Sequence, residues 1–494
     1  MSLLEHLPVL AVVLPLLAAP LCVLVGRERA AWMIALTAAV ASAVAAVLLL
    51  MRVSSVGSLS YALGGWAPPW GIEYRVDLLG GYVLLLVTVI AALVLCFAPR
   101  SIEREITAAR RVNFYAALLL VQAGLAGITV TGDVFNLFVF LEIASLASYA
   151  LVSMGSDRRA LSAAFNYLVM GTIGATFILI GIGFLYMMTG TLNMQDLAAR
   201  LPAVADTRTV QAGFAFLTVG IGLKLALFPL HQWLPNAYAY APSVVSVLLA
   251  ATATKVAVYA LIRFVFSLFG RDWAFSTMNL ELVLLPLAIA GVLITSIIAV
   301  YQRDLKRMLA YSSVAQVGYM LMGIALASVT GLTATLLHLF NHALMKATLF
   351  MALGAVMYRI GSVQLQDLAG LGQRMPLTMA AFVVGGLSLV GMPLTVGFVS
   401  KWYLLLAVLE RGWWWLAAVV LVSSLIALIY VWRVVEVAYF RPPQVPPTGQ
   451  EEAPLSLLLP TWVLVFANLY FGIDTSMSVG IASDAARALL GVES

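Results

Sequence analysis

The chain contains 494 residues, of which 63% are hydrophobic and only 10% carry a charge. A soluble domain has about 25% charged residues, so this composition excludes a soluble protein and predicts an all-α polytopic membrane protein. The net charge of +5 is modest. No cluster of interleaved basic and aromatic residues indicates nucleic-acid binding, so we expect no nucleic-acid partner.

The sequence contains none of the short motifs that hold a nucleotide or a metal cluster. Cys22 and Cys96 lie in separate apolar runs, which excludes an iron–sulfur or Cys-based zinc site within the chain. There is no GxxxxGK motif and no GxGxxG motif that opens a helix. We therefore expect no cofactor, no metal and no catalytic redox site in this chain.

Apolar segments follow one another along the whole chain. A helix needs about 20 mainly apolar residues to cross a bilayer. The first segment has no cleavage site after it, so we interpret it as a membrane helix and not as a signal peptide. Fourteen spans are predicted: 8–26, 32–51, 78–98, 112–130, 133–154, 163–188, 211–230, 242–268, 280–300, 308–327, 331–358, 377–406, 413–440 and 455–473.

Basic residues are concentrated in the connections that follow odd-numbered spans. Examples are Arg27, Arg100, Arg110, Arg303 and Arg433. Because cytoplasmic loops carry the excess of Lys and Arg, these connections are predicted to be cytoplasmic. Both termini are then outside, and we expect a multi-pass protein of a bacterial inner membrane.

Four of the five lysines fall inside predicted spans. They are Lys224, Lys255, Lys346 and Lys401. Even on the lenient insertion scale, a Lys at the centre of a membrane helix costs roughly 2.5–3.5 kcal/mol. Low dielectric disfavours the charged form of an amine, so a row of such lysines is a candidate path for protons.

Other polar residues accompany these lysines. Glu142 lies near the middle of span 133–154, where a carboxylate should protonate or find a cation; a structural tether between helices is the alternative. His231 lies between Pro229 and Pro235. It is a further candidate, although a loop histidine near the membrane interface fits the same position. Asp133 is predicted to cap the helix that it precedes.

The segment LLHLFNHALMKATLF places His338, His342 and Lys346 at spacings of four residues. Side chains with this spacing share one face of a helix. Two such histidines can bind zinc, but no Glu follows the first one and no third ligand is evident. A hydrogen-bonded relay fits better. Lys346 belongs either to this relay or to a tether with a neighbouring helix.

Two predicted spans contain proline interruptions. Pro229 and Pro235 follow Lys224 in the seventh span, and Pro393 precedes Lys401 in the twelfth. Broken helices at membrane depth mark transport sites. An offset of five helices reverses the membrane orientation, so we expect two inverted five-helix repeats. The resulting units are residues 1–110 (helices 1–3), 111–270 (helices 4–8), 271–441 (helices 9–13) and 442–494 (helix 14).

Three segments resemble the antiporter-like family: FNLFVFLEIASLASYALV, GLKLALFPLHQWLPNAYAYAPSVVSVLLAATATKVAVYAL and LFNHALMKATLF. This family includes the D subunit of Mrp-type multisubunit sodium/proton antiporters. It also includes the proton-pumping membrane subunits of respiratory complex I and of membrane-bound hydrogenases. The resemblance implies fourteen helices with two inverted five-helix repeats.

The resemblance also implies roles for individual residues. Glu142 matches the family's glutamate on helix 5, which pairs with a lysine on helix 7, here Lys224. Lys255 matches the helix-8 lysine of a central proton axis. The remaining matches are His338 and His342 in the helix-11 polar cluster and Lys401 as the terminal residue on helix 12.

The segment FNLFVFLE is most similar to the D-type Mrp subunit. Lys401 argues against the middle antiporter-like subunit of complex I, where Glu is usual. Since the chain ends soon after the last span, we expect neither the lateral helix of the distal complex I subunit nor the extended tail of the large Mrp subunit. We therefore expect a proton-translocating subunit of a multisubunit cation/proton antiporter, with other membrane subunits as partners and protons, with or without Na⁺, as the transported ions.

Several alternatives stay open on the sequence alone. The chain can belong to a complex I-like or hydrogenase complex, and so to an ion-translocating oxidoreductase, or to an inorganic-carbon uptake complex. A stand-alone solute carrier would instead need a central cavity with selective polar groups. A purely structural scaffold would not need four buried lysines.

Overall fold

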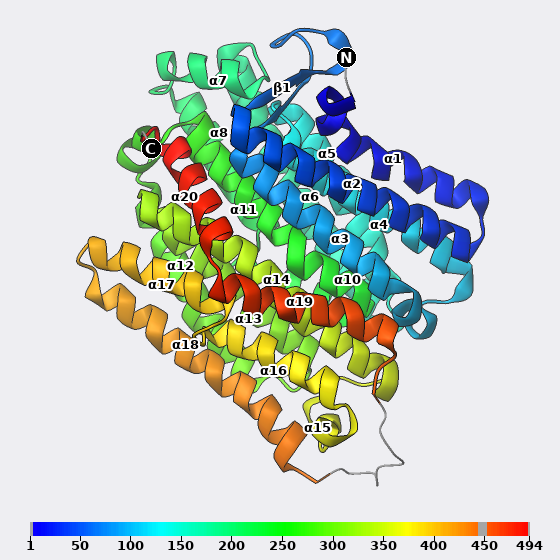
Figure 1. Ribbon diagram of the computed structural model, residues 1–494. Coiled ribbons are helices and arrows are strands. Elements are labelled where there is room, and N and C mark those ends of the chain that lie inside the picture. Colours follow the sequence, from blue (N-terminus) through cyan, green and yellow to red (C-terminus); the bar gives the residue numbers. More distant parts are fainter. Residues whose placement is uncertain (1–2, 443–451, 493–494) are drawn as a thin grey trace.

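The computed structural model describes residues 3–442 and 452–492 and is built almost wholly of helices (Figure 1). Twelve helical segments in this part of the chain are long and apolar enough to cross a membrane. Two further segments, 208–240 and 376–410, are each interrupted near their middle. The predicted all-α polytopic fold with broken helices 7 and 12 is therefore confirmed.

Three helices precede the repeats. They are α1 (Leu7–Val25), α2 (Glu28–Val56) and α3 (Leu78–Glu105). The sequence did not predict the small antiparallel hairpin between α2 and α3, whose strands are β1 (Leu59–Ala62) and β2 (Glu73–Val76). In Figure 1 this hairpin lies at the same end of the molecule as α7 (Met194–Arg200), and α15 (Leu371–Arg374) lies at the opposite end.

The order of elements in the first repeat recurs in the second. The first repeat contains α4 (Ala108–Val130), α5 (Val134–Ser153), α6 (Arg159–Thr189), α8 (Arg208–Lys224) with α9 (Trp233–Tyr240), and the continuous helix made of α10 (Ser243–Leu248), η4 (Leu249–Ala253), α11 (Thr254–Ile262) and η5 (Arg263–Leu268). The second contains α12 (Leu280–Tyr301), α13 (Leu305–Ala325), α14 (Val329–Ile360), α16 (Pro376–Val390) with α17 (Val396–Glu410), and α18 (Trp414–Val435) with η8 (Glu436–Phe440). Both series end in a π-helical turn. Because each series crosses five times, the second has the opposite orientation.

Side-chain contacts hold the two halves of helix 7 in place at its interruption. Helix α8 ends at Lys224, and the chain resumes a helical course at Trp233. The Trp233 indole donates from Nε1 to the carbonyl of Leu223 (3.0 Å) in the last turn of α8. The Trp233 ring also stacks on Tyr167 of α6, with the ring centroids 4.1 Å apart. The break is thus a defined structure that fixes the position of Lys224.

The interruption in helix 12 is a close backbone approach that requires glycine. A Cβ atom on Gly397 would lie 1.7 Å from the Ser388 carbonyl oxygen. Gly391 adopts a φ of +95°, and a Cβ atom there would meet the side chain of Lys401. Glycine is suited to both positions because it lacks Cβ and tolerates positive φ.

Helix α14 forms the centre of the second repeat. Every residue from Gly331 to Val356 is buried, and α14 packs against α13, α16, α17, α19 and α20. A membrane helix that is enclosed on all sides can carry polar groups that lipid would not tolerate. The polar residues of α14 therefore lie in the interior of the protein.

The C-terminal region contains two helices where one was predicted. Helix α19 (Leu455–Ile473) matches the last predicted span, but α20 (Ser476–Leu490) continues from it at an angle, as Figure 1 shows in red. The prediction of a single helix in the unit 442–494 is therefore incomplete, because the described part of that unit contains α19 and α20. Helix α20 mixes small and polar residues and has no long apolar run, so a search for apolar segments does not find it.

We expect the Gly397→Ala variant to lose about 1–3 kcal/mol of stability, because overpacking against backbone cannot be relieved by a rotamer change. The measurement is thermal unfolding of the purified protein in detergent. Gly183→Ala in α6 is the matched control, since a Cβ atom at that position would meet nothing within 4 Å. Equal melting temperatures for the two variants would contradict the described packing of helix 12.

Candidate functional site

The predicted pair between helices 5 and 7 is present. Lys224 Nζ donates to Glu142 Oε1 (3.1 Å), to Ser145 Oγ (2.8 Å) and to Tyr149 Oη (3.4 Å). The Lys224 side chain is 8% exposed, whereas that of Glu142 is 23% exposed. Two unit charges 4 Å apart attract by about 4 kcal/mol at an effective dielectric of about 20. This attraction is enough to offset the cost of placing one lysine in the membrane.

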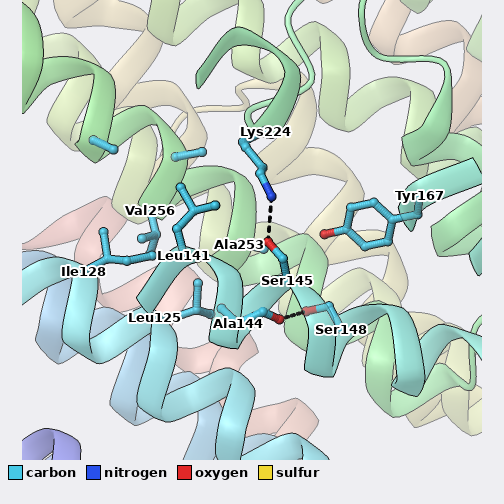
Figure 2. A pocket seen from close by; sticks show the side chains of 12 residues that line it. Leu125, Ile128, Leu141, Ala144, Ser145, Ser148, Tyr167, Lys224, Ala253 and Val256 are labelled. Atoms are coloured by element: carbon cyan, nitrogen blue, oxygen red, sulfur yellow. Dashed lines mark hydrogen bonds between the residues drawn. The ribbon is translucent and has the colours of Figure 1, made fainter. Parts of the chain in front are cut away.

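A small cavity lies beside Lys224 and faces the π-helical part of helix 8. Its volume is about 40 Å³, and a cavity holds a water molecule once its volume exceeds about 10–15 Å³. The walls are largely apolar, but Lys224, Ser145 and Tyr167 contribute polar groups (Figure 2). Val256 and Ala257 of α11 also line the cavity. The cavity therefore provides space for water between Lys224 and helix 8.

Lys255 is fully buried just after the π-helical turn Leu249–Ala253. Its Nζ atom donates to the carbonyl of Ala250 within that turn and lies 3.5 Å from Thr254 Oγ1. Single π-helical turns are frequent at functional sites because they widen the helix and alter its hydrogen-bond ladder. The turn here supplies a neutral acceptor to a buried amine.

The two histidines of α14 stack on one face, as their spacing predicts. The rings of His338 and His342 are 5.9 Å apart and nearly parallel. His338 Nδ1 is 2.9 Å from Ser400 Oγ of α17. Among the described residues, no partner contacts His338 Nε2 or either ring nitrogen of His342. Buried polar groups are normally hydrogen-bonded, so bound water is the natural partner for these nitrogens.

Lys346 continues the same face of α14. Its Nζ atom donates to the Leu309 carbonyl (2.8 Å) and to Ser312 Oγ (2.5 Å), both on α13. The contacts with α13 are those expected of a tether. Lys346 also lies one helical turn beyond His342 on the same face of α14, so its place in the relay stays a prediction.

Lys401 lies at the interruption of helix 12. Its Nζ atom donates to the carbonyls of Leu389 (3.1 Å) and Val390 (2.9 Å) and to Ser424 Oγ (2.9 Å). The two carbonyls belong to the C-terminal end of α16, where a cation interacts favourably with the helix dipole. Nζ also lies 5.1 Å from the ring centroid of Tyr319.

Tyr319 connects Lys401 with the histidines. Its ring packs against that of His338 with 5.6 Å between centroids, and its hydroxyl is 2.5 Å from Ser423 Oγ. The predicted residues on helices 11 and 12 therefore form one buried cluster, and helix 8, which carries Lys255, packs against α14. The small cavity beside Lys224 reaches helix 8 at Val256 and Ala257, which follow Lys255 in sequence.

His231 lies apart from the lysines and histidines described above. It is buried in the interruption of helix 7, where its ring stacks on Phe228 and meets the edge of Tyr311. Asp133 caps α5 by accepting a hydrogen bond from the amide of Asn136 (2.7 Å), so the predicted cap is confirmed. No group of three or more His, Cys, Asp or Glu side chains suited to a metal ion occurs within residues 3–442 and 452–492.

The fifth lysine, Lys306, is also buried, although it falls outside the predicted spans. Lys306 lies in the first turn of α13, is 2% exposed and donates to the Ala241 carbonyl (3.1 Å). Its Nζ atom lies 3.8 Å from Glu105 Oε2. Glu105 also accepts from the amide of Ser243 (2.9 Å) at the start of helix 8. This ion pair joins α3, α10 and α13 at the end of the molecule opposite the hairpin.

The serines that hold the amines were likewise not predicted. They carry no periodic signal in apolar helices, although Ser145 follows Glu142 by three residues and Ser400 directly precedes Lys401. The hydroxyl-bearing residues that contact the buried lysines or His338 are Ser145, Tyr149, Ser312, Tyr319, Ser400 and Ser424.

Comparison with known proteins places this arrangement in a family. The sequence profile of the family described as NADH:quinone oxidoreductase/Mrp antiporter, TM, matches residues 131–427. The chain is 44% identical over 483 residues to NADH-quinone oxidoreductase subunit N of Desulforudis audaxviator, covering 95% of this chain and 96% of that protein. It is 29% identical over 486 residues to the D subunit of the Na(+)/H(+) antiporter of Bacillus subtilis, covering 98% of this chain and 97% of that protein.

Solved structures of similar chains have the same fold. A chain of the Mrp complex from Dietzia sp. DQ12-45-1b superposes with a TM-score of 0.91 at 27% identity, covering 99% of this chain and 98% of that chain. A chain of the membrane-bound sulfane sulfur reductase, an archaeal respiratory membrane complex, superposes with a TM-score of 0.89 at 29% identity, covering 98% of each. These matches confirm the resemblance that the sequence motifs indicated.

We expect a strong energetic coupling between Glu142 and Lys224. Removing one partner of a largely buried ion pair leaves an uncompensated charge, whereas replacing both partners is much less costly. Glu142→Gln alone should therefore destabilise the protein by about 2 kcal/mol or more relative to the double variant Glu142→Gln/Lys224→Met. Thermal unfolding in detergent measures this difference. Additive effects of the two substitutions would show that the side chains do not interact.

Proposed function

Because the chain belongs to the NADH:quinone oxidoreductase/Mrp antiporter family, we propose that it is the proton-translocating, Mrp D-type subunit of a multisubunit cation/proton antiporter. The observation that carries this proposal is the buried line of ionisable groups from the Glu142–Lys224 pair through Lys255 and the histidines to Lys401. A structural scaffold has no use for such a line, because each unpaired amine in it costs stability.

The proposed proton path begins at Lys224, which Glu142 holds in its charged form. If this pair opens, the low dielectric favours loss of the proton from Lys224. The small cavity provides room for water to pass the proton toward Lys255. The two histidines follow, each with two ring nitrogens that can accept and donate protons, and Lys401 is the terminal residue on the far side. His231 is a further candidate beside the break in helix 7.

Each charge in this line alters the proton affinity of the next. Lys255, Lys346 and Lys401 are held by carbonyl and hydroxyl oxygens, which stabilise a proton without neutralising its charge. A charge that arrives at one lysine therefore repels the charge at its neighbour through the protein interior. This electrostatic coupling would drive stepwise transfer along the line.

The proposal includes partners and orientation. The similar proteins of known structure are chains of an Mrp complex and of a respiratory membrane complex, which supports other membrane subunits as partners of this chain. Protons are the transported ions, together with Na⁺ through this subunit or a partner. The excess of basic residues in the odd-numbered connections supports an orientation with both termini on the outer side of the membrane.

A second candidate function is favoured by one observation. The identity of 44% to an NADH-quinone oxidoreductase subunit N supports a proton-pumping membrane subunit of a complex I-like assembly. The buried line would serve either complex in the same way. The two functions differ in what drives the proton and therefore in the subunits that accompany the chain.

We expect Lys224→Ala to abolish ion-coupled proton movement while the complex still assembles, because the substitution removes the amine that starts the path. The measurement is fluorescence quenching by a pH-sensitive dye in inverted vesicles that contain the whole complex. Thr218→Ala is the control on the same helix, since the Thr218 hydroxyl donates to the carbonyl of Phe214 within that helix. Full activity of Lys224→Ala in an assembled complex would refute the proposed path.

We expect affinity purification of the tagged chain to recover small multi-helix antiporter subunits if the complex is of the Mrp type. Mass spectrometry of the purified complex identifies them. Recovery of quinone-binding or hydrogenase subunits instead would replace the first candidate function with the second. Recovery of the chain alone, with transport intact, would refute both.

A further inference from the structure

The outward face of α20 is largely polar, although Met477 and Ala488 are also exposed on the helix. Ser476, Gly480, Ser483, Asp484 and Arg487 lie on one side of the helix, at least partly exposed. The opposite side carries the buried Ser478, Ala482, Ala485 and Ala486. A helix that faced hydrocarbon would show the reverse pattern, because lipid does not solvate polar side chains. The outward face of α20 is therefore unsuited to lipid.

Asp474 lies at the inner end of this face, in the junction between α19 and α20. The depth of the junction is given by its neighbours: Gly472 abuts the backbone of Leu394 and Thr395 in the interruption of helix 12. Helices of fifteen residues extend on either side of that interruption. Phe471 also packs on Phe340, two residues from His338. Asp474 thus lies well inside the membrane, near the depth of the proton line.

The Asp474 side chain is exposed and is held only by close neighbours in sequence. It accepts from the amide of Ser476 (3.1 Å), from Ser476 Oγ (2.6 Å) and from Tyr470 Oη (3.3 Å). These bonds fix its position and satisfy part of its charge. Within the described part of the chain, no Lys or Arg forms an ion pair with it.

Apolar side chains surround this carboxylate on the outer surface. Leu394 is 66% exposed and Ile473 is 68% exposed, and Met392, Tyr470 and Met477 are exposed beside them. Ionisable groups at membrane depth usually face the protein interior or pair with one another. An intramembrane carboxylate that faced lipid alone would be strongly disfavoured.

We propose that this surface is the docking site for a transmembrane helix of a different subunit, which places a Lys or Arg against Asp474. We call it the Asp474 face; it comprises Asp474, the exposed apolar residues around it and the polar side of α20. Charge complementarity identifies the occupant as cationic. A second copy of this chain does not fit, because its five lysines have buried or nearly buried side chains and its arginines lie near helix ends or in connections.

This inference rests on the proposed membership in a multisubunit complex and adds to it a specific contact. The test uses the full complex expressed from its own gene cluster, with a tag on this chain. We expect Asp474→Asn to reduce the amount of co-purified partner and Asp474→Lys to reduce it about tenfold or more, because a like charge replaces an attractive one. Asp206→Lys, in the exposed connection between α7 and α8, should change nothing.

A photo-crosslinking residue at position 473 identifies the occupant. We expect mass spectrometry to find it joined to a transmembrane peptide that contains Lys or Arg. Exchange of that basic residue for Asp should then restore assembly in the Asp474→Lys background. Adducts with lipid alone, or an intact complex with Asp474→Lys, would overturn the inference.

The outcomes also separate this inference from the proposed function. Size-exclusion chromatography of each variant confirms that the chain itself is folded. If the wild-type chain purifies without partners, the proposed membership in a complex fails. If the wild-type complex is intact and Asp474→Lys does not weaken it, only the docking site fails.

Discussion

A charge in a low-dielectric interior needs an opposite charge or hydrogen-bond acceptors around it. The fold provides one or the other for each buried lysine of the proposed path. Among the lysines of the proposed path, only Lys224 meets a carboxylate within the described residues. Lys255 and Lys401 are instead held by carbonyls in distorted parts of helices, namely a π-helical turn and a helix end. The distortions expose acceptors that a regular helix would occupy with its own amides. They hold each amine without neutralising it, which leaves its charge free to act on the next group.

The same constraint explains why the second repeat is closed around α14. Two histidines and a lysine on one helix face can be buried only if neighbouring helices cover them completely. Helices α13, α16, α17, α19 and α20 provide that cover. The contacts of α13 and α17 with this face are hydroxyl and carbonyl groups, so the cover is polar where it meets the line and apolar elsewhere. The line therefore runs laterally through the molecule and not toward the lipid.

Much of this arrangement can be predicted from the sequence. Apolar runs predict the spans, the spacing of His338, His342 and Lys346 predicts their shared face, and the prolines predict the two breaks. The pairing of Glu142 with Lys224 came from the family resemblance and not from hydropathy. Other features depend on tertiary contacts and leave no local pattern: the serines that hold the amines, the burial of Lys306 against Glu105, and α20, whose small and polar residues resemble a surface segment.

The central claim is that water joins the buried amines into one path. The most direct measurement is a cryo-electron microscopy map of the assembled complex at a resolution that shows ordered water. We expect water molecules in the cavity beside Lys224 and at the ring nitrogens of His342, linking Lys224, Lys255 and Lys401 without a gap. A dry, apolar separation between Lys224 and Lys255 would contradict the account.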